Sequence, residues 1–127
     1  HATDVIDPEF GDIAHGFDIK LPILELGAHV APTGLIFYDH DAFGSEYTNN
    51  IFIALHGSWN RSSKVGYKLV RVVLDGSGNV VAMEDFVTGF LDNQSVLGRP
   101  SAPMLMRDGS LLLSDDKSNT IFRIVKK

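Results

Sequence analysis

Short apolar segments, rich in β-branched and aromatic residues and separated by glycines, are the feature that most constrains how this chain can fold. Such segments favour β-strands, and no stretch shows sustained helical periodicity. The pattern therefore predicts an all-β fold. The expected strands are Gly34–Tyr38, Asn50–His56, Tyr67–Leu74, Val80–Val87, Ala102–Met106, Ser110–Ser114 and Thr120–Val125.

The segments between these strands carry residues that form tight turns. Asp-Gly-Ser-Gly-Asn at 75–79 separates two expected strands, and Asp108-Gly109 separates two others. Glycine, Asn and Asp tolerate the positive φ angles of hairpin turns. Strands that are neighbours in the sequence are therefore expected to pair antiparallel.

The strands fall into two similar series, which indicates a repeated unit. Four short antiparallel strands per unit are typical of a β-propeller blade, although a single sandwich or barrel would give similar segments. We expect about two four-stranded antiparallel blades, at about residues 32–90 and 98–127, after a connecting segment at residues 1–31. Propellers close with 4–8 blades. The ring is therefore expected to be incomplete, with the other blades on the same or another chain, or supplied by three copies of this one.

Charge and composition exclude several kinds of partner and site. The chain has 11 Lys plus Arg, 16 Asp plus Glu and a formal charge of −5, without a basic cluster, which argues against nucleic acid or an anionic membrane as partner. It contains no cysteine, which excludes disulfides, thiolate metal sites and Cys nucleophiles. Its apolar runs are too short for a membrane-spanning helix.

One loop, residues 56–62 (His-Gly-Ser-Trp-Asn-Arg-Ser), combines side chains that turn formation alone does not explain. Arg61 could bind an anionic planar ligand through charge-assisted hydrogen bonds, and Trp59 could pack on its face. Alternatively, Trp59 fills the space between blades, and Asn60 and Arg61 brace the backbone. The residues leave both interpretations open.

Arg99 and His29 stand before the expected inner strands of the two blades. Inner strands line the central channel of a propeller, where Arg99 could meet ligand carboxylates or form a salt bridge to a blade carboxylate. His29 could be a base, a metal ligand or a hydrogen-bonding brace. The carboxylate pairs Asp39/Asp41 and Asp115/Asp116 could bind calcium or cap turns.

Taken in order, these motifs resemble the C-terminal part of the glucose/sorbosone dehydrogenase family, which are soluble sugar dehydrogenases that use pyrroloquinoline quinone (PQQ). The resemblance rests on a set of segments between about residues 28 and 124. They are Ala28–Tyr38, His56–Ser62, Gly66–Lys68, Phe86–Phe90, Gly98–Pro100, Asp108–Asp116 and Phe122–Ile124.

The resemblance implies a six-bladed propeller, of which this chain would be about the last third, with PQQ at the mouth of the central channel. A histidine base and calcium would serve the oxidation of a sugar. Both the base and the main calcium ligands belong to earlier blades in this family. We therefore expect no catalytic residue in this chain, leave its metal ligands unknown, and expect the chain alone to be inactive. The resemblance also implies a periplasmic or secreted location.

Residue by residue, the resemblance places Arg99 toward the quinone carboxylates. It makes Arg61 the charged contact from the loop, with Asn60, Trp59 and His56 as its neighbours, and His29 a candidate at the rim. The chain departs from the family pattern after Pro100: Ser101 stands in place of a second arginine, and Pro103 removes a ladder donor. These departures favour an alternative, a non-catalytic β-propeller module for binding or scaffolding.

Overall fold

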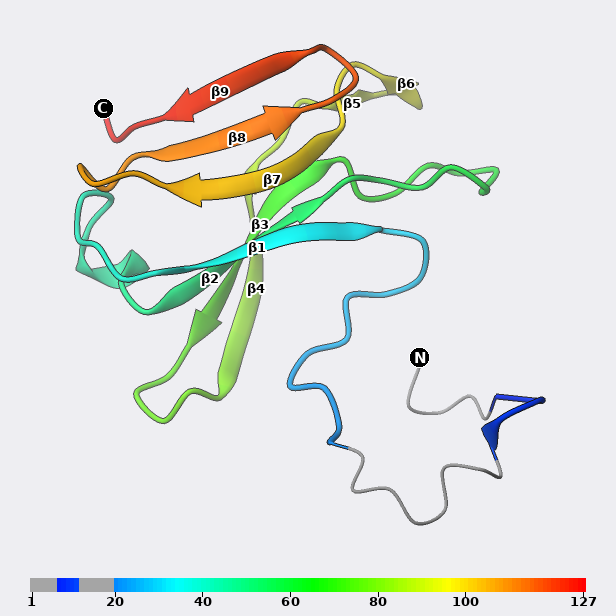
Figure 1. Cartoon of the computed structure of the whole chain (residues 1–127), viewed down its shortest axis with the longest axis horizontal. Coiled ribbons are helices and arrows are strands. Elements are labelled where there is room, and N and C mark those ends of the chain that lie inside the picture. The colour runs from blue at the N-terminus through cyan, green and yellow to red at the C-terminus, as the bar shows by residue number, and fades with distance from the viewer. Residues whose placement is uncertain (1–6, 12–19) are drawn as a thin grey trace.

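A computed structural model of the chain describes residues 7–11 and 20–127 (Figure 1). In this part the fold is all-β, with three antiparallel sheets and the short 3-10 helix η2 (Ser45–Tyr47). The four-stranded sheet contains, in spatial order, β1 (Pro32–Tyr38), β2 (Asn50–Leu55), β3 (Lys68–Leu74) and β4 (Val80–Val87). A hairpin follows, formed by β5 (Leu91–Asp92) and β6 (Ser95–Val96). The three-stranded sheet contains β7 (Pro100–Leu105), β8 (Leu111–Asp115) and β9 (Thr120–Ile124).

The predicted turns join neighbouring strands as expected, and every pairing is antiparallel. At the β3–β4 turn, Oδ1 of Asp75 accepts the backbone N–H groups of Ser77 and Asn79, each within 2.9 Å. Gly78 and Gly109 have φ angles of 84° and 80°, which glycine adopts without steric cost. Local turn chemistry therefore sets the strand order within each sheet.

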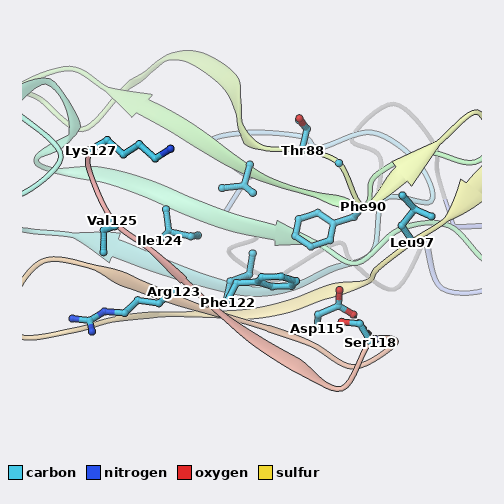
Figure 2. Close-up of a pocket in the computed structure, with 13 residues that line it drawn as sticks. Thr88, Phe90, Leu97, Asp115, Ser118, Phe122, Arg123, Ile124, Val125 and Lys127 are labelled. Atoms are coloured by element: carbon cyan, nitrogen blue, oxygen red, sulfur yellow. Dashed lines mark hydrogen bonds between the residues drawn. The ribbon is translucent and has the colours of Figure 1, made fainter.

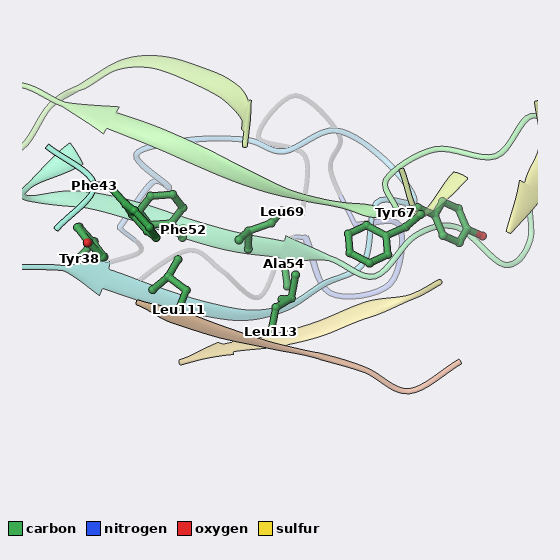
Figure 3. Close-up of a cluster of buried hydrophobic side chains, with 9 residues drawn as sticks. Tyr38, Phe43, Phe52, Ala54, Tyr67, Leu69, Leu111 and Leu113 are labelled. Carbon is green, nitrogen blue, oxygen red and sulfur yellow. The ribbon is translucent and has the colours of Figure 1, made fainter. Parts of the chain in front are cut away.

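The main hydrophobic core lies between the four-stranded and the three-stranded sheet (Figure 3). Alternate residues of each strand point into it, as the period of two along a strand requires. The fully buried side chains include Tyr38, Phe52 and Leu69 from one sheet and Leu111 and Leu113 from the other. The two large sheets, which are separated in the sequence by the β5–β6 hairpin, are thus held together by their facing apolar surfaces.

A second cluster covers the other face of the four-stranded sheet. It consists of Ile53, Leu55, Val70 and Val72, and Leu24, Leu26 and Val30 pack against it from the segment before β1. Of the expected connecting segment, residues 1–6 and 12–19 lie outside the described residues, and residues 20–31 contain no strand.

The two large sheets approach each other most closely at β1 and β7. A Cβ atom on Gly34 would lie 2.9 Å from the carbonyl oxygen of Ser101 and 3.0 Å from Cδ of Pro103. The hydroxyl of Thr33 also donates to the Ser101 carbonyl at 2.7 Å. On the other side of the interface, the end of β4 and strand β9 leave an apolar groove of about 540 Å³ (Figure 2). The interface is therefore wedge-shaped, narrow at β1 and β7 and open near β9.

Two features differ from the sequence prediction. The second repeat has three paired strands rather than the four expected of a blade, because only the three predicted apolar segments of residues 98–127 pair as strands. The β5–β6 hairpin was not predicted; Asn93 and Gln94 form its turn with φ angles of 42° and 72°. Its strands are two residues long, too short to show alternation.

Pro103 is accommodated by an irregular ladder rather than by loss of the strand. The β7–β8 register shifts between Pro100 and Pro103. There the hydroxyl of Ser114 accepts the N–H of Ala102 at 3.1 Å, in place of a regular ladder bond. The strand tolerates proline because the ladder is already interrupted beside it.

Candidate functional site

The motifs identified in the sequence meet at one end of the two large sheets. Strands β1, β3 and β7 begin at this end, and β2 and β8 finish there. The register shows it directly, because Pro32 is opposite Leu55 in one sheet and Pro100 is opposite Asp115 in the other. Antiparallel pairing thus brings the loops of each sheet to this end, and the packing of the two sheets brings together loops that lie more than forty residues apart in the sequence.

The segment before β1 is joined to the loop after β2 by backbone hydrogen bonds. The N–H of His56 donates to the carbonyl of Ala31, and that of Gly57 to the carbonyl of Val30, both at 2.9 Å. His29, the next residue outward, is exposed and has a φ angle of 67°. The structure therefore places His29 at the edge of this loop cluster.

The base of the loop after β2 is buried and internally bonded. Ser58 is 3% exposed, its N–H donates to the carbonyl of Val65 at 2.9 Å, and its hydroxyl accepts the N–H of Val65 at 3.1 Å. The hydroxyl of Tyr67 donates to the Ser58 carbonyl. Gly57 has a φ angle of 99°, and a Cβ there would lie 2.5 Å from the Tyr67 ring, so both the backbone and the space require glycine.

The tip of the same loop faces solvent. Trp59 is 85% exposed, and Asn60 and Arg61 are also exposed. Trp59 therefore does not fill the space between these two sheets. An exposed indole and an exposed guanidinium two residues apart on one loop can both contact a flat anionic molecule.

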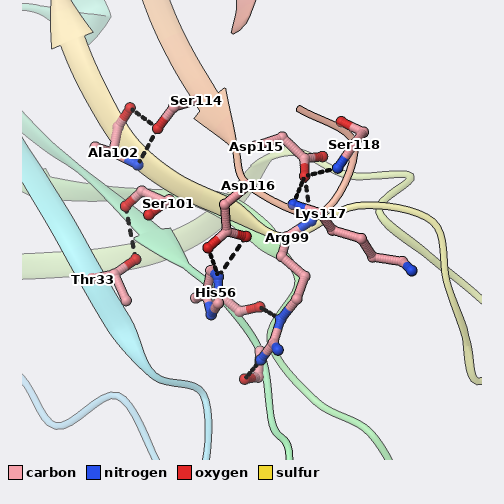
Figure 4. A network of polar contacts seen from close by, with 11 residues as sticks. Thr33, His56, Arg99, Ser101, Ala102, Ser114, Asp115, Asp116, Lys117 and Ser118 are labelled. Atoms are coloured by element: carbon pink, nitrogen blue, oxygen red, sulfur yellow. Dashed lines mark hydrogen bonds and ion pairs between the residues drawn. The ribbon is translucent and has the colours of Figure 1, made fainter. Parts of the chain in front are cut away.

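The guanidinium of Arg99 reaches from the three-stranded sheet to the base of this loop (Figure 4). Nη2 donates to the carbonyl of Gly57 at 3.0 Å and Nε to that of His56 at 3.4 Å. The guanidinium carbon lies 5.7 Å from the centre of the Tyr67 ring, within the range of a cation–π contact. Arg99 therefore contacts carbonyl oxygens rather than the carboxylate that the sequence left as an alternative. These contacts use two of the five N–H donors of a guanidinium and leave three for another acceptor.

Asp115 organises the turn after β8. Its Oδ1 accepts the backbone N–H groups of Arg99, Lys117 and Ser118 at 2.9–3.0 Å. Burial alone would raise the pKa of Asp115, but these hydrogen bonds outweigh it and hold the pKa below its ordinary value. Its Oδ2 is buried without a hydrogen-bond partner among the described residues. The turn-capping interpretation of Asp115 is therefore confirmed.

Asp116 connects the two sheets through the side chain of His56 (Figure 4). Both carboxylate oxygens lie 3.0 Å from Nε2 of His56. The imidazole is 17% exposed and Asp116 is 61% exposed. His56 and Arg99, predicted as neighbours of one site, are thus brought together by the fold.

A contact from the β5–β6 hairpin was not predicted from the sequence. Gln94 accepts the backbone N–H of Lys64 through Oε1, and its carbonyl accepts Nζ of Lys64, both at 2.6 Å. The hairpin therefore supports the loop from its far side. Polar residues at 92–95 between two glycines were the only signal in the sequence for a turn there.

The other predicted carboxylate pair, Asp39 and Asp41, lies beyond the opposite end of β1. Between these residues, Nδ1 of His40 accepts the N–H of Ala42 at 3.0 Å. Within residues 7–11 and 20–127, no three His, Asp or Glu side chains are grouped so that they could hold a metal ion.

Comparison with known proteins identifies the family. A family model described as TrAA12-like matches residues 14–127, which is most of the chain. The chain belongs to the TrAA12-like family. An uncharacterized protein of Borreliella burgdorferi is 46% identical over 120 residues, which is 87% of this chain and 32% of that protein.

Other similar proteins carry the names of quinone-dependent enzymes. A pyrroloquinoline quinone-dependent pyranose dehydrogenase of Coprinopsis cinerea is 34% identical over 125 residues, covering 84% of this chain and 16% of that protein. The holo form of the PQQ domain of the Coprinopsis cinerea pyranose dehydrogenase matches with a TM-score of 0.61 and 31% identity, over 77% of this chain and 27% of that one.

A Trichoderma reesei structure of carbohydrate-active enzyme family AA12 matches with a TM-score of 0.54 and 21% identity, over 61% of this chain and 22% of that one, which indicates a shared fold.

The chain thus spans a third or less of the length of these relatives. The similarity to PQQ-dependent sugar enzymes agrees with the sequence analysis, while the narrower glucose/sorbosone dehydrogenase family stays a prediction. Among the described residues there is no helix long and apolar enough to cross a membrane.

Proposed function

We propose that the chain is part of a sugar-oxidising quinoprotein, and that its two large sheets are neighbouring blades of a six-bladed β-propeller. The wedge-shaped interface supports this arrangement, because blades arranged around an axis approach closely at their inner strands and diverge outward. Strands β1 and β7 would be the inner strands. The similarity to PQQ-dependent pyranose dehydrogenase supports the assignment of the cofactor.

The observation that carries the proposal is the meeting of the loop 56–61 with Arg99 at one end of the inner strands. In this proposal Arg61 and the three uncommitted N–H groups of Arg99 bind carboxylates of the quinone, and Trp59 packs on its flat face. Asn60, His56 and His29 form the surrounding rim. The donor set fits PQQ, because a flat polyanion requires cations and an aromatic surface.

When bound, PQQ would accept the hydride of the sugar. The residues of this chain would bind and orient the quinone, and the catalytic base and the calcium ligands would lie in the remaining blades of the longer protein. The chain alone should therefore bind PQQ without oxidising sugars. Oxidation of an aldose by residues 1–127 with PQQ and calcium would contradict this division of roles.

Trp59 provides the test, because it is the only tryptophan of the chain. We expect PQQ to quench its fluorescence saturably. In Arg61→Ala the dissociation constant should rise about tenfold or more, since a hydrogen bond to a charged group contributes about 1.5–3 kcal/mol. Arg107→Ala is the matched control, because Arg107 is an exposed arginine in the β7–β8 turn at the opposite end of the sheet. Absence of saturable quenching, or equal effects of the two substitutions, would refute the proposed site.

The alternative is a binding or scaffold module without a quinone. The engagement of Arg99 with backbone carbonyls favours it, because that role requires no cofactor. The same titration distinguishes the two functions, since a scaffold module would not show saturable quenching by PQQ.

A further inference from the structure

We infer that Arg99 and Asp116 act as a clasp from the three-stranded sheet, which positions the loop base His56–Ser58 and through it Trp59. Both contacts cross from one large sheet to the other (Figure 4). The positioning role goes beyond the proposed quinone contact of Arg99. The effect of this positioning on ligand binding rests on the proposed function, whereas its effect on the conformation of the loop does not.

The loop needs such support because the sheet ladder ends just before it. The β1–β2 and β2–β3 registers stop at Leu55. The chain then turns through Gly57, with a φ of 99°, and reaches the exposed Trp59 two residues later. Backbone N–H groups of His56 and Gly57 are bonded to the segment before β1, and Arg99 donates to the carbonyls of the same two residues. The loop base is thus held from both sides.

Arg99 is itself held in a defined position. Its backbone N–H donates to the buried Asp115, and the next residue is Pro100, which favours an extended backbone at Arg99. The side chain lies over the ring of Tyr67, whose hydroxyl donates to Ser58 in the same loop. The fork of the guanidinium allows one side chain to reach two successive carbonyls, which a lysine ammonium would not reproduce.

Asp116 controls the chemistry of the His56 ring. An ionised carboxylate accepts hydrogen bonds only, so Nε2 of His56 must carry the proton that it donates to Asp116. In neutral His56 the other ring nitrogen, Nδ1, is then an unprotonated acceptor. The clasp therefore decides which ring nitrogen of neutral His56 is the hydrogen-bond acceptor.

The effect of Arg99 on the loop backbone is tested by the hydrogen exchange of the Gly57 and Ser58 amides, measured by NMR on the 127-residue chain. In Arg99→Ala we expect both amides to exchange at least tenfold faster, with Arg99→Lys closer to Arg99→Ala than to the wild type. Arg123→Ala is the matched control from the same sheet, because Arg123 bonds Asp108 and Ser110 at the opposite end. Amides in β2 and β8 report whether each variant keeps its fold.

The effect of Asp116 on the His56 ring is tested by the ¹⁵N chemical shifts of the two ring nitrogens, measured on the neutral ring. We expect the Nε2–H tautomer in the wild type and a mixture of tautomers in Asp116→Ala. Unchanged exchange of Gly57 and Ser58 in Arg99→Ala, or a wild-type ring protonated on Nδ1, would overturn the clasp. Accelerated exchange together with no quenching of wild-type Trp59 by PQQ would support the clasp and refute the proposed function, so the two failures are distinguishable.

Discussion

Replacing Gly34 by alanine should push the two large sheets apart at their closest approach. The added Cβ would lie 2.9 Å from the carbonyl oxygen of Ser101, 3.0 Å from Cδ of Pro103 and 3.1 Å from Cα of Ala102. Two of these atoms belong to the backbone of β7 and the third to a proline ring, so none can move by a simple side-chain rotation. Relief therefore requires β1 and β7 to separate by a few tenths of an ångström.

The expected cost follows from three opposing contributions. Overpacking a well-packed interface costs about 1–3 kcal/mol. Alanine recovers about 0.5–1 kcal/mol, because glycine loses more conformational entropy in a strand. Separation also weakens the bond from the Thr33 hydroxyl to Ser101, whose net contribution is about 0.5–1.5 kcal/mol. We expect a net destabilisation of about 2 kcal/mol, which lowers the urea midpoint by about 1 M.

Urea unfolding followed by far-ultraviolet circular dichroism measures this change. Gly76→Ala is the matched control, because a Cβ on Gly76 meets no atom within 4 Å and its φ does not require glycine. It should leave the stability unchanged or raise it by up to about 1 kcal/mol. If Gly34→Ala were as stable as Gly76→Ala, the close packing of β1 against β7 would be wrong.

Two further predictions concern acid stability and the core. Hydrogen bonds from the Ser110 hydroxyl and N–H, and then the contact with Arg123, lower the pKa of Asp108 to about 2 from an ordinary value of 3.8. The folded pKa is below the unfolded one, so the contribution of Asp108 to stability is complete above about pH 4 and is lost as the pH falls toward about 2. Urea midpoints at pH 5 and pH 3 should therefore differ less in Asp108→Asn than in the wild type, and an equal difference would contradict the assignment. Leu113 is fully buried between the sheets, so Leu113→Ala should lower the free energy of unfolding by about 2–5 kcal/mol in the same assay. Leu35→Ala, at an exposed position, should lower it by about 0.5 kcal/mol or less. Similar losses of stability at both positions would refute the placement of the core.

The residues of the candidate site could be predicted from the sequence, but the contacts that they make could not. His56, Trp59, Asn60, Arg61 and Arg99 stand out in the sequence because polar and aromatic side chains follow or precede apolar strands. Which of them face solvent and which face the protein depends on atoms far away in the chain. Trp59 is exposed because the positive φ of Gly57 turns the chain away from the sheets.

Local patterns along the chain were sufficient to predict the strands and their order. Alternation, β-branched residues and turn dipeptides act over a few residues, so all seven predicted strands are present with boundaries shifted by no more than two residues. The tertiary structure, by contrast, established the long-range contacts: Arg99 with the carbonyls of His56 and Gly57, and Asp116 with the His56 ring. It also decided that a short hairpin supports the loop. Such contacts depend on how two sheets pack, and no local pattern along the chain encodes the distance between them.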